Sequence, residues 1–389
     1  MRRSGSIVFD ARYVRERPSG IGAMVDELVR RLPALLPSER FHFLRHPAAR
    51  TPLSSAPNAT EETVRAEANG PGTLFQLPLS RSVRAAKLFF APANILPFRV
   101  PCPSIVTVHD LMWLDSPELC RSPGPWGVVE TAFYQAGLGN TLRSATAIVC
   151  PSHATKEAIA QRSSRAAGRT TVVPHGVDDA FRHGIQGDLP SDDDAGCKDA
   201  MQRHVPGARR YVLTVGQAAG YKNHDGVLRA FAEAFPHDDG THLVFVQRLG
   251  AESGRLRAMA RTLGVHARVH VLPTLPFGDL LALLRGAICL CHPSFVEGWG
   301  MPITEALAAG CPVLTSTTSC MPEVTGGAAE LVEPTSTHSI ALGLRRLASE
   351  PERREALRVL GLSRAAQLLW TNTAARTAEV FAQVLDARH

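Results

Sequence analysis

The sequence has no apolar run that approaches the roughly 18 residues of a membrane-spanning helix. Its first segment, MRRSGSIVFDAR, lacks the apolar stretch of about 7 to 15 residues that is typical of a secretory signal. The two absences argue against an integral membrane protein and against a secreted one. We therefore expect a cytoplasmic protein, with peripheral contact at the inner face of the membrane as the open alternative.

Aromatic residues are scarce, at 6% of the chain, and they form no stripe with basic residues. Nucleic acid is therefore the weakest candidate for a partner. The 8 cysteines show no paired spacing, and several lie inside apolar runs, such as Cys150, Cys289 and Cys291. We expect reduced core thiols rather than disulfides. Cys289 and Cys291 lack a second ligand cluster, so no metal site is expected there.

The composition is that of an ordinary globular protein, with 44% hydrophobic and 20% charged residues. At about 150 residues per domain, a chain of 389 residues predicts two domains. The net charge of +6 comes from residues 1–188, which hold 22 Lys and Arg against 16 Asp and Glu. This basic excess is consistent with an anionic acceptor, with a membrane surface or with a solvated face.

Short apolar runs alternate with helical segments in both halves of the chain, which predicts an α/β protein with two doubly wound parallel sheets. We place the first domain at residues 1–188 and the second at 205–369. The polar segment 189–204 between them is interpreted as a linker. In the first domain, the Gly20-x-Gly22 pair is interpreted as a loop before a helix from Ala23 to Leu36.

The stretch from His292 to Pro312 carries the strongest functional signal. A buried strand ends in a loop with Gly298 and Gly300, and a helix begins near Pro302. Free amides at such a helix start bind phosphate, and Glu305 in the first turn could accept hydrogen bonds from vicinal sugar hydroxyls. The stretch predicts a nucleotide-sugar site. The plain alternative is that its glutamates are ordinary helix-start carboxylates.

Candidate functional residues also follow two other predicted strands. The strand that ends at Gly216 leads through Gln217 to Lys222, which lies where a helix takes over, and a first-domain strand ends at His109. The segment from Arg81 to Phe90 combines the cations of Arg81, Arg84 and Lys87 with two phenylalanines. We considered contact with an anionic membrane for this segment, and favour an element that leads into the core with its cations outside.

The spacing Glu297-x7-Glu305, with Gly-Trp-Gly-Met-Pro between, resembles the paired-glutamate signature of retaining GT-B glycosyltransferases of the family-4 type. Four segments of the first domain also resemble parts of the same family. They are Ser19 to Gly22, His109 to Leu111, Pro151-Ser152 and Pro174 to Asp178. The resemblance implies two Rossmann-like domains that face each other across a cleft, the first on the acceptor side. It also implies that the final helix, residues 370–389, crosses back to the first domain.

The resemblance further implies how the residues act. Lys222 and the amides of the helix start would surround the diphosphate of a GDP- or UDP-linked hexose, Glu305 would hold the ribose, and Glu297 would contact the transferred sugar. His109 would approach from the first domain, and we assign it to catalysis with Glu297 and Lys222. The implied donor-binding residues are Gly20, Gly22, Gly216, Gln217, Lys222, Arg248, Glu297, Gly298, Trp299, Gly300, Met301, Pro302 and Glu305.

No metal or other cofactor is expected, because fixed cations and dipoles replace it. The sequence departs from the family at Tyr221, where an arginine is usual, and Arg248 is our candidate for the second cation. The acceptor is expected to be a saccharide, a lipid-linked sugar or a natural product.

Three alternatives remain. They are a nucleotide-sugar 2-epimerase on the same architecture, a non-catalytic two-domain sugar-binding protein, and a metal-dependent GT-A enzyme that uses Asp192 to Asp194.

Overall fold

The structure is a computed structural model that describes residues 5–15, 20–122, 124–182, 195–237, 240–246 and 252–387. The chain forms two compact units, one of Met1–Gly176 with Trp370–His389 and one of Val177–Leu369. The division comes earlier than the predicted boundary at 188, because the Val177 amide donates a 3.0 Å hydrogen bond to the Leu368 carbonyl within the second unit.

The predicted linker 189–204 also differs from the structure. Helix α8 (Ala195–His204) occupies its second half and packs on α11 (Phe277–Gly286) in the second unit. Residues 189–194 lie outside the described residues.

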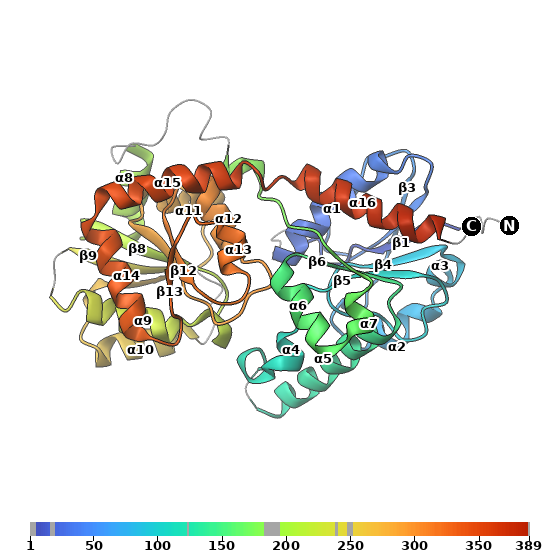
Figure 1. Ribbon diagram of the computed structural model, residues 1–389, viewed down its shortest axis with the longest axis horizontal. Helices are drawn as coiled ribbons and strands as arrows, with labels where there is room; N and C mark the ends of the chain where they lie inside the picture. The colour runs from blue at the N-terminus through green and yellow to red at the C-terminus, as the bar shows by residue number, and fades with distance from the viewer. Residues whose placement is uncertain are drawn as a thin grey trace. The chain divides into compact units, whose positions relative to one another are not determined.

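The described part of the first unit contains one sheet of seven parallel strands, in the order β3-β2-β1-β4-β5-β6-β7 (Figure 1). Its strands are β1 (Ile7–Asp10), β2 (Phe41–Arg45), β3 (Ala59–Thr63), β4 (Leu88–Ala91), β5 (Ser104–Thr107), β6 (Ala147–Cys150) and β7 (Thr170–Val172). Its helices are α1 (Gly20–Leu35), α2 (Pro71–Phe75), α3 (Arg81–Ala85), α4 (Met112–Asp115), α5 (Pro125–Ser144), α6 (His153–Arg162), α7 (Ser164–Ala167) and α16 (Trp370–Asp386), with short 3-10 turns at Leu77–Leu79 and Pro117–Leu119.

Helices cover both faces of this sheet, which is why its central strands are buried along their whole length. Successive side chains of β4 point to opposite faces. Phe89 belongs to the core cluster formed with α5 and α6, and the ring of Phe90 lies 5.0 Å from that of Phe381 in α16. Helix α16 also packs on α1. The final helix therefore returns to the first unit, as predicted.

The described part of the second unit contains a sheet of six parallel strands, in the order β10-β9-β8-β11-β12-β13. The strands are β8 (Arg210–Val215), β9 (Thr241–Val246), β10 (Val269–Leu272), β11 (Cys289–His292), β12 (Val313–Ser316) and β13 (Glu330–Val332). Besides α8 and α11, the helices are α9 (His224–Ala234), α10 (Glu252–Thr262), α12 (Met301–Ala309), α13 (Met321–Thr325), α14 (Thr337–Ser349) and α15 (Pro351–Ala365), and short 3-10 turns lie at Asp179–Phe181, Gly220–Lys222 and His266–Arg268. The two doubly wound parallel sheets confirm the predicted fold class.

One local prediction for the first unit is wrong, and another is confirmed. Gly20 and Gly22 lie in the first turn of α1 rather than in a loop, and the helix runs from Gly20 to Leu35 instead of from 23 to 36. Phe89 and Phe90 are fully buried, so neither ring can reach a membrane. Lys87 forms an ion pair with Glu39. The segment leads into the core, as the favoured interpretation predicted.

The 8 cysteines are free thiols, as expected, and all except Cys120 are buried. Among the described residues, no helix is both long enough and apolar enough to cross a bilayer.

Candidate functional site

The candidate site lies at the carboxyl edge of the second unit's sheet. Strands β8 and β11 are parallel neighbours, with Leu213 beside Leu290. The loops that follow them, one ending in Lys222 and the other containing Glu297, therefore leave the sheet at the same edge. This edge is where ligands bind in open α/β sheets.

Glu297 is held by its first carboxylate oxygen and is only 8% exposed. Its Oε1 accepts hydrogen bonds from Lys222 Nζ at 2.6 Å, from Ser294 Oγ at 2.9 Å and from His292 Nε2 at 3.0 Å. Within the described residues, its Oε2 accepts none. One oxygen is thus anchored while the other is available to a ligand.

The backbone of Glu297 is fixed from a separate loop. Its amide donates to Ser319 Oγ at 3.2 Å, and the same hydroxyl donates to the Glu297 carbonyl at 2.8 Å. Ser319 follows β12, so two neighbouring strand ends set the position of the carboxylate.

Burial by itself would raise the pKa of Glu297. The charge of Lys222 and the hydrogen bond from His292 outweigh that effect, and the pKa of Glu297 falls to about 2. Burial and the charge of Lys222 in turn lower the pKa of His292. At neutral pH, Glu297 is therefore a carboxylate, and it forms an ion pair with Lys222.

Asn223 positions Lys222. It adopts the left-handed conformation with a φ of 57° and caps α9, accepting from the Gly226 amide at 3.2 Å. Its side-chain nitrogen donates to the carbonyls of Pro293 at 3.1 Å and Pro334 at 2.8 Å. Asn223 therefore ties the Lys222 turn to the loop that follows β11, which holds Lys222 next to Glu297.

Tyr221 stands where the resembled family usually has an arginine. Its ring centre lies 5.2 Å from Lys222 Nζ, and its hydroxyl accepts from Gln217 Nε2 at 3.0 Å. This position thus offers an aromatic face to the lysine instead of a second cation. Gly216 has a φ of 155°, a value that side-chain-bearing residues rarely adopt. Arg248, the predicted second cation, lies outside the described residues.

The loop after Glu297 ends in a helix start without a side-chain cap. Gly300 is the N-cap of α12, with a φ of 80° that favours glycine, and Pro302 lies in the first turn. The helix begins at Met301, which confirms the predicted start near Pro302. Its uncapped amides suit an anion. Trp299 is only 4% exposed, so its ring belongs to the core while its backbone remains in the loop.

Glu305 is the fifth residue of α12, so the first turn has no acidic residue, contrary to our expectation. Burial and the nearby charge of Asp178 raise the pKa of Glu305 to about 7, with Lys222 opposing them. Its carboxyl group makes no hydrogen bond or ion pair with the described residues. Near pH 7, the carboxyl group of Glu305 therefore populates both its charged and its neutral form. It is available to form hydrogen bonds with a ligand.

His109 lies at the carboxyl edge of the first unit's sheet, just after β5. Its Nε2 donates to the Pro92 carbonyl at 2.8 Å, and its Nδ1 lies 3.4 Å from Nε2 of His175. Burial lowers the pKa of His109 to about 4, although the bond to Pro92 opposes this. The imidazole is therefore neutral at physiological pH, and its Nε2 already donates a hydrogen bond to the backbone.

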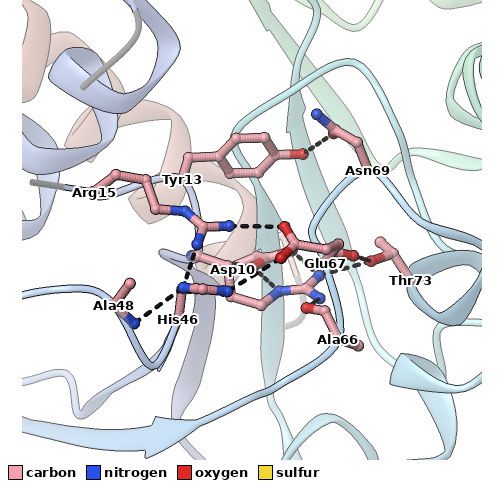
Figure 2. Close-up of polar contacts among 10 residues, drawn as sticks. Asp10, Tyr13, Arg15, His46, Ala48, Ala66, Glu67, Asn69 and Thr73 are labelled. Atoms are coloured by element: carbon pink, nitrogen blue, oxygen red, sulfur yellow. Dashed lines mark hydrogen bonds and ion pairs between the residues drawn. The ribbon is translucent and has the colours of Figure 1, made fainter. Parts of the chain in front are cut away.

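The same edge of the first unit carries a polar network that the sequence did not reveal. Arg12 is fully buried, and its side chain donates two hydrogen bonds to Asp10, from Nε at 2.7 Å and from Nη2 at 2.6 Å. Figure 2 shows Arg15 and His46 directed at Glu67, which lies on the loop after β3. Asp10 is the last residue of β1 and His46 follows β2 directly, and a polar residue at a strand end was a usable signal.

The structure thus brings Lys222, Glu297, Gly216, Gly300 and the start of α12 together. Gly20, Gly22 and His109 belong to the first unit. Three partners of Glu297 were missed, namely His292, Ser294 and Ser319. His292 is the last residue of its strand, and such positions commonly carry function.

Within the described residues, no group of three or more His, Cys, Asp and Glu side chains is placed to hold a metal ion. The segment Asp192 to Asp194, considered above as a metal site, lies outside those residues.

Comparison with known proteins adds two family matches. The family described as "Glycosyl transferases group 1" matches residues 198–360, and "Glycosyltransferase Family 4" matches residues 82–181.

Among curated proteins, the chain is 24% identical to O-antigen chain mannosyltransferase B of Escherichia coli over 296 residues, which covers 76% of this chain and 74% of the relative. It is 28% identical to D-inositol 3-phosphate glycosyltransferase of Corynebacterium glutamicum over 221 residues, 55% of this chain and about half (51%) of that protein.

Among solved structures, Anabaena Alr3699/HepE, crystallised with UDP and glucose, has a similar fold. Its TM-score is 0.73 at 19% identity, over 97% of this chain and 100% of that one. At this identity, the likeness concerns the fold alone.

Proposed function

We propose that this chain, which belongs to the group 1 glycosyltransferases of the family-4 type, transfers a hexose from a nucleotide-diphosphate sugar to an acceptor. We further propose that the configuration at the anomeric carbon is retained. The donor is a GDP- or UDP-linked mannose-like or glucose-like sugar. The acceptor is a saccharide, a lipid-linked sugar or a natural product. The names of the relatives support this range, since they include a mannosyltransferase and an inositol-phosphate glycosyltransferase.

The observation that carries the proposal is the anchored carboxylate of Glu297 beside Lys222. A catalytic group must be fixed before the reaction, and three hydrogen bonds to Oε1 fix this one while Oε2 remains open to a sugar hydroxyl. Lys222 has three N–H donors, of which one goes to Glu297. The others, with the uncapped amides of α12, suit the oxygens of a diphosphate.

We assign the reaction to a displacement on one face of the sugar. The bond between the anomeric carbon and the diphosphate oxygen breaks, and the bond to the acceptor oxygen forms on the same face. The leaving diphosphate takes the acceptor's proton. Glu297, whose pKa of about 2 keeps it charged, is assigned to positioning the transferred sugar.

Acceptor recognition is assigned to the first unit. The loops after β1 and β3 place the Tyr13 hydroxyl 2.9 Å from Asn69 Oδ1, and Glu67 is largely exposed beside them. Hydroxyl, amide and carboxylate groups of this kind suit a polyhydroxylated acceptor.

Incubation with a panel of nucleotide sugars, with and without saccharide acceptors, tests the proposal. We expect nucleoside diphosphate to be released in proportion to a glycosylated product, whose anomeric configuration is read by NMR. Conversion of the donor into an epimer without acceptor would assign the chain to 2-epimerases instead. Donor binding without turnover would assign it to binding proteins.

Metal independence is the first specific prediction. If Lys222 and the α12 amides neutralise the diphosphate, turnover in excess EDTA should stay within about twofold of its value in buffer, since no metal supplies charge stabilisation. Initial rates of nucleoside diphosphate release measure this. Loss of activity in EDTA that magnesium or manganese restores would contradict the prediction and return attention to Asp192 to Asp194.

Binding of the nucleoside diphosphate should depend on the charge of Glu305. With a pKa of about 7, raised from its ordinary range, the carboxyl group is mostly neutral at pH 6 and mostly ionised at pH 8. The ionised form accepts hydrogen bonds from both ribose hydroxyls, so affinity should rise with pH through this window. Replacing Glu305 by Ala should weaken binding by about 10- to 100-fold at pH 8, the loss of charge-assisted hydrogen bonds. Calorimetry measures both effects.

A Glu305→Gln variant provides the control for this pH dependence. It keeps the shape of the side chain but cannot ionise, so any remaining change with pH comes from the phosphates of the ligand. If wild type and Glu305→Gln show the same pH profile and the same affinity, the ribose is held elsewhere.

A further inference from the structure

A second surface of the first unit has a different character from the site. A groove of about 780 Å³ lies beside α2, and its lining is mostly apolar, with Phe75, Leu79 and Phe98 among its residues. Phe75 is 62% exposed and Leu79 is 63% exposed, high values for side chains of this size. Scattered single apolar residues are normal on a surface, whereas two beside one groove call for a partner.

Arginines predominate among the charges around this groove. Arg99 lines it, and α3, which begins two residues after Leu79, exposes Arg81 and Arg84. The sequence contains no Asp or Glu from residue 68 to residue 109. The acid Glu62 contacts α3 through a hydrogen bond with Ser82, and its carboxylate also accepts a hydrogen bond from His42 Nε2 at 3.1 Å.

The groove also lies at the edge of the sheet opposite to His109. Ser104, which lines the groove, is the first residue of β5, whereas His109 follows the last residue of that strand. A partner bound at the groove would therefore leave the carboxyl edge of the first unit accessible.

We propose that this surface, formed by Phe75, Leu79, Arg81, Arg84 and Arg99, binds the face of an anionic lipid bilayer. The arginines would lie among the lipid headgroups, and the two exposed apolar side chains would enter the boundary below them. A second copy of this chain is the less suitable occupant. A self-complementary contact would bring the same arginines of both copies together, and like charges repel.

This inference does not depend on glycosyl transfer, and it places Phe75 and Leu79 at the membrane rather than Phe89 and Phe90, which are buried. The test is sedimentation of the full-length protein with vesicles of phosphatidylcholine alone or with phosphatidylglycerol added. Binding is expected only to the anionic vesicles. It should be stronger at 0.01 M than at 0.1 M salt, where the Debye length falls from about 30 Å to about 10 Å.

Two variants address the two halves of the surface. Arg81→Gln with Arg84→Gln should weaken anionic binding by about 30-fold, since each cation near such a surface contributes about fivefold. Phe75→Ser with Leu79→Ser should weaken it by about tenfold or more, because less apolar surface leaves water. All four positions are exposed, so thermal unfolding should be unchanged.

The matched control is Trp126→Ser with Val128→Ser. These residues are as exposed as Phe75, with Trp126 at 72%, and belong to the same unit. Their helix carries the acid Glu130, which accepts from the Ser122 amide nearby. The control should bind anionic vesicles like the wild type.

Three results would overturn the proposal. They are no binding to anionic vesicles at low salt, equal binding to neutral vesicles, and loss of binding in the Trp126 control but not in the Phe75 variant. Analytical ultracentrifugation adds a fourth, a dimer that Phe75→Ser dissociates, which would make the surface a contact between copies.

Discussion

Replacement of Lys222 by Ala is expected to lower turnover by about 10²- to 10³-fold. If the lysine stabilises the leaving diphosphate as a preorganised donor does, its loss removes about 2 to 4 kcal/mol of transition-state stabilisation. An exposed surface lysine would change turnover by no more than about twofold, because exposed charges contribute little. Lys198→Ala, an exposed lysine of the same unit, is the matched control. Steady-state kinetics of nucleoside diphosphate release measure both variants.

The ion pair with Glu297 offers a second explanation for such a loss. Lys222 and Glu297 are both buried, and removal of one partner leaves an uncompensated charge that typically costs about 3 to 5 kcal/mol of stability. Thermal unfolding of Lys222→Ala separates an unfolded protein from an inactive one.

A double-mutant cycle separates the two roles of Lys222. If it serves the diphosphate, removing it in a Glu297→Gln background should still weaken binding of the nucleoside diphosphate by about tenfold or more, the value of a charge-assisted hydrogen bond. If it only neutralises Glu297, removing it in that background should leave the affinity unchanged, and our assignment would be wrong.

For Glu297→Ala, we expect turnover to fall by at least about 100-fold with the fold intact. The carboxylate is fixed through Oε1 by Lys222, His292 and Ser294, so its loss removes a preorganised group at the reacting sugar. The effect should appear in kcat more than in KM, because contact with the nucleotide remains. Glu355→Gln, an exposed carboxylate on α15, is the matched control.

Ser294→Ala refines the assignment of Glu297. It removes one hydrogen bond to Oε1 but keeps the charge, so an intermediate loss of kcat is expected if the orientation of the carboxylate matters. Near-normal turnover of Glu297→Ala, in a protein that unfolds at the wild-type temperature, would remove Glu297 from the catalytic group.

The sequence by itself determined the fold class and the central stretch of the site. The alternation of short apolar runs with helical segments predicts two parallel sheets, because strands covered on both faces must be apolar throughout. Gly298 to Pro302 predicts the turn and the helix start, because glycine and proline have strong local preferences. Glu297 and Lys222 were both predicted, since each follows a strand end.

Only the tertiary structure decided how these residues meet. Lys222 and Ser319 reach Glu297 because the loops after β8, β11 and β12 leave the sheet at one edge, and no local pattern gives the register of separate strands. The raised pKa of Glu305 arises from burial and from Asp178, which is far away in sequence.

Tertiary structure also decided which apolar side chains are buried. Phe89 and Phe90 are buried, whereas Phe75 and Leu79 are exposed. Local sequence predicts which side chains are apolar, whereas the neighbouring strands and helices decide which of them leave water. The apolar part of the surface that we propose for lipid, Phe75 and Leu79, therefore lies before the segment from Arg81 to Phe90.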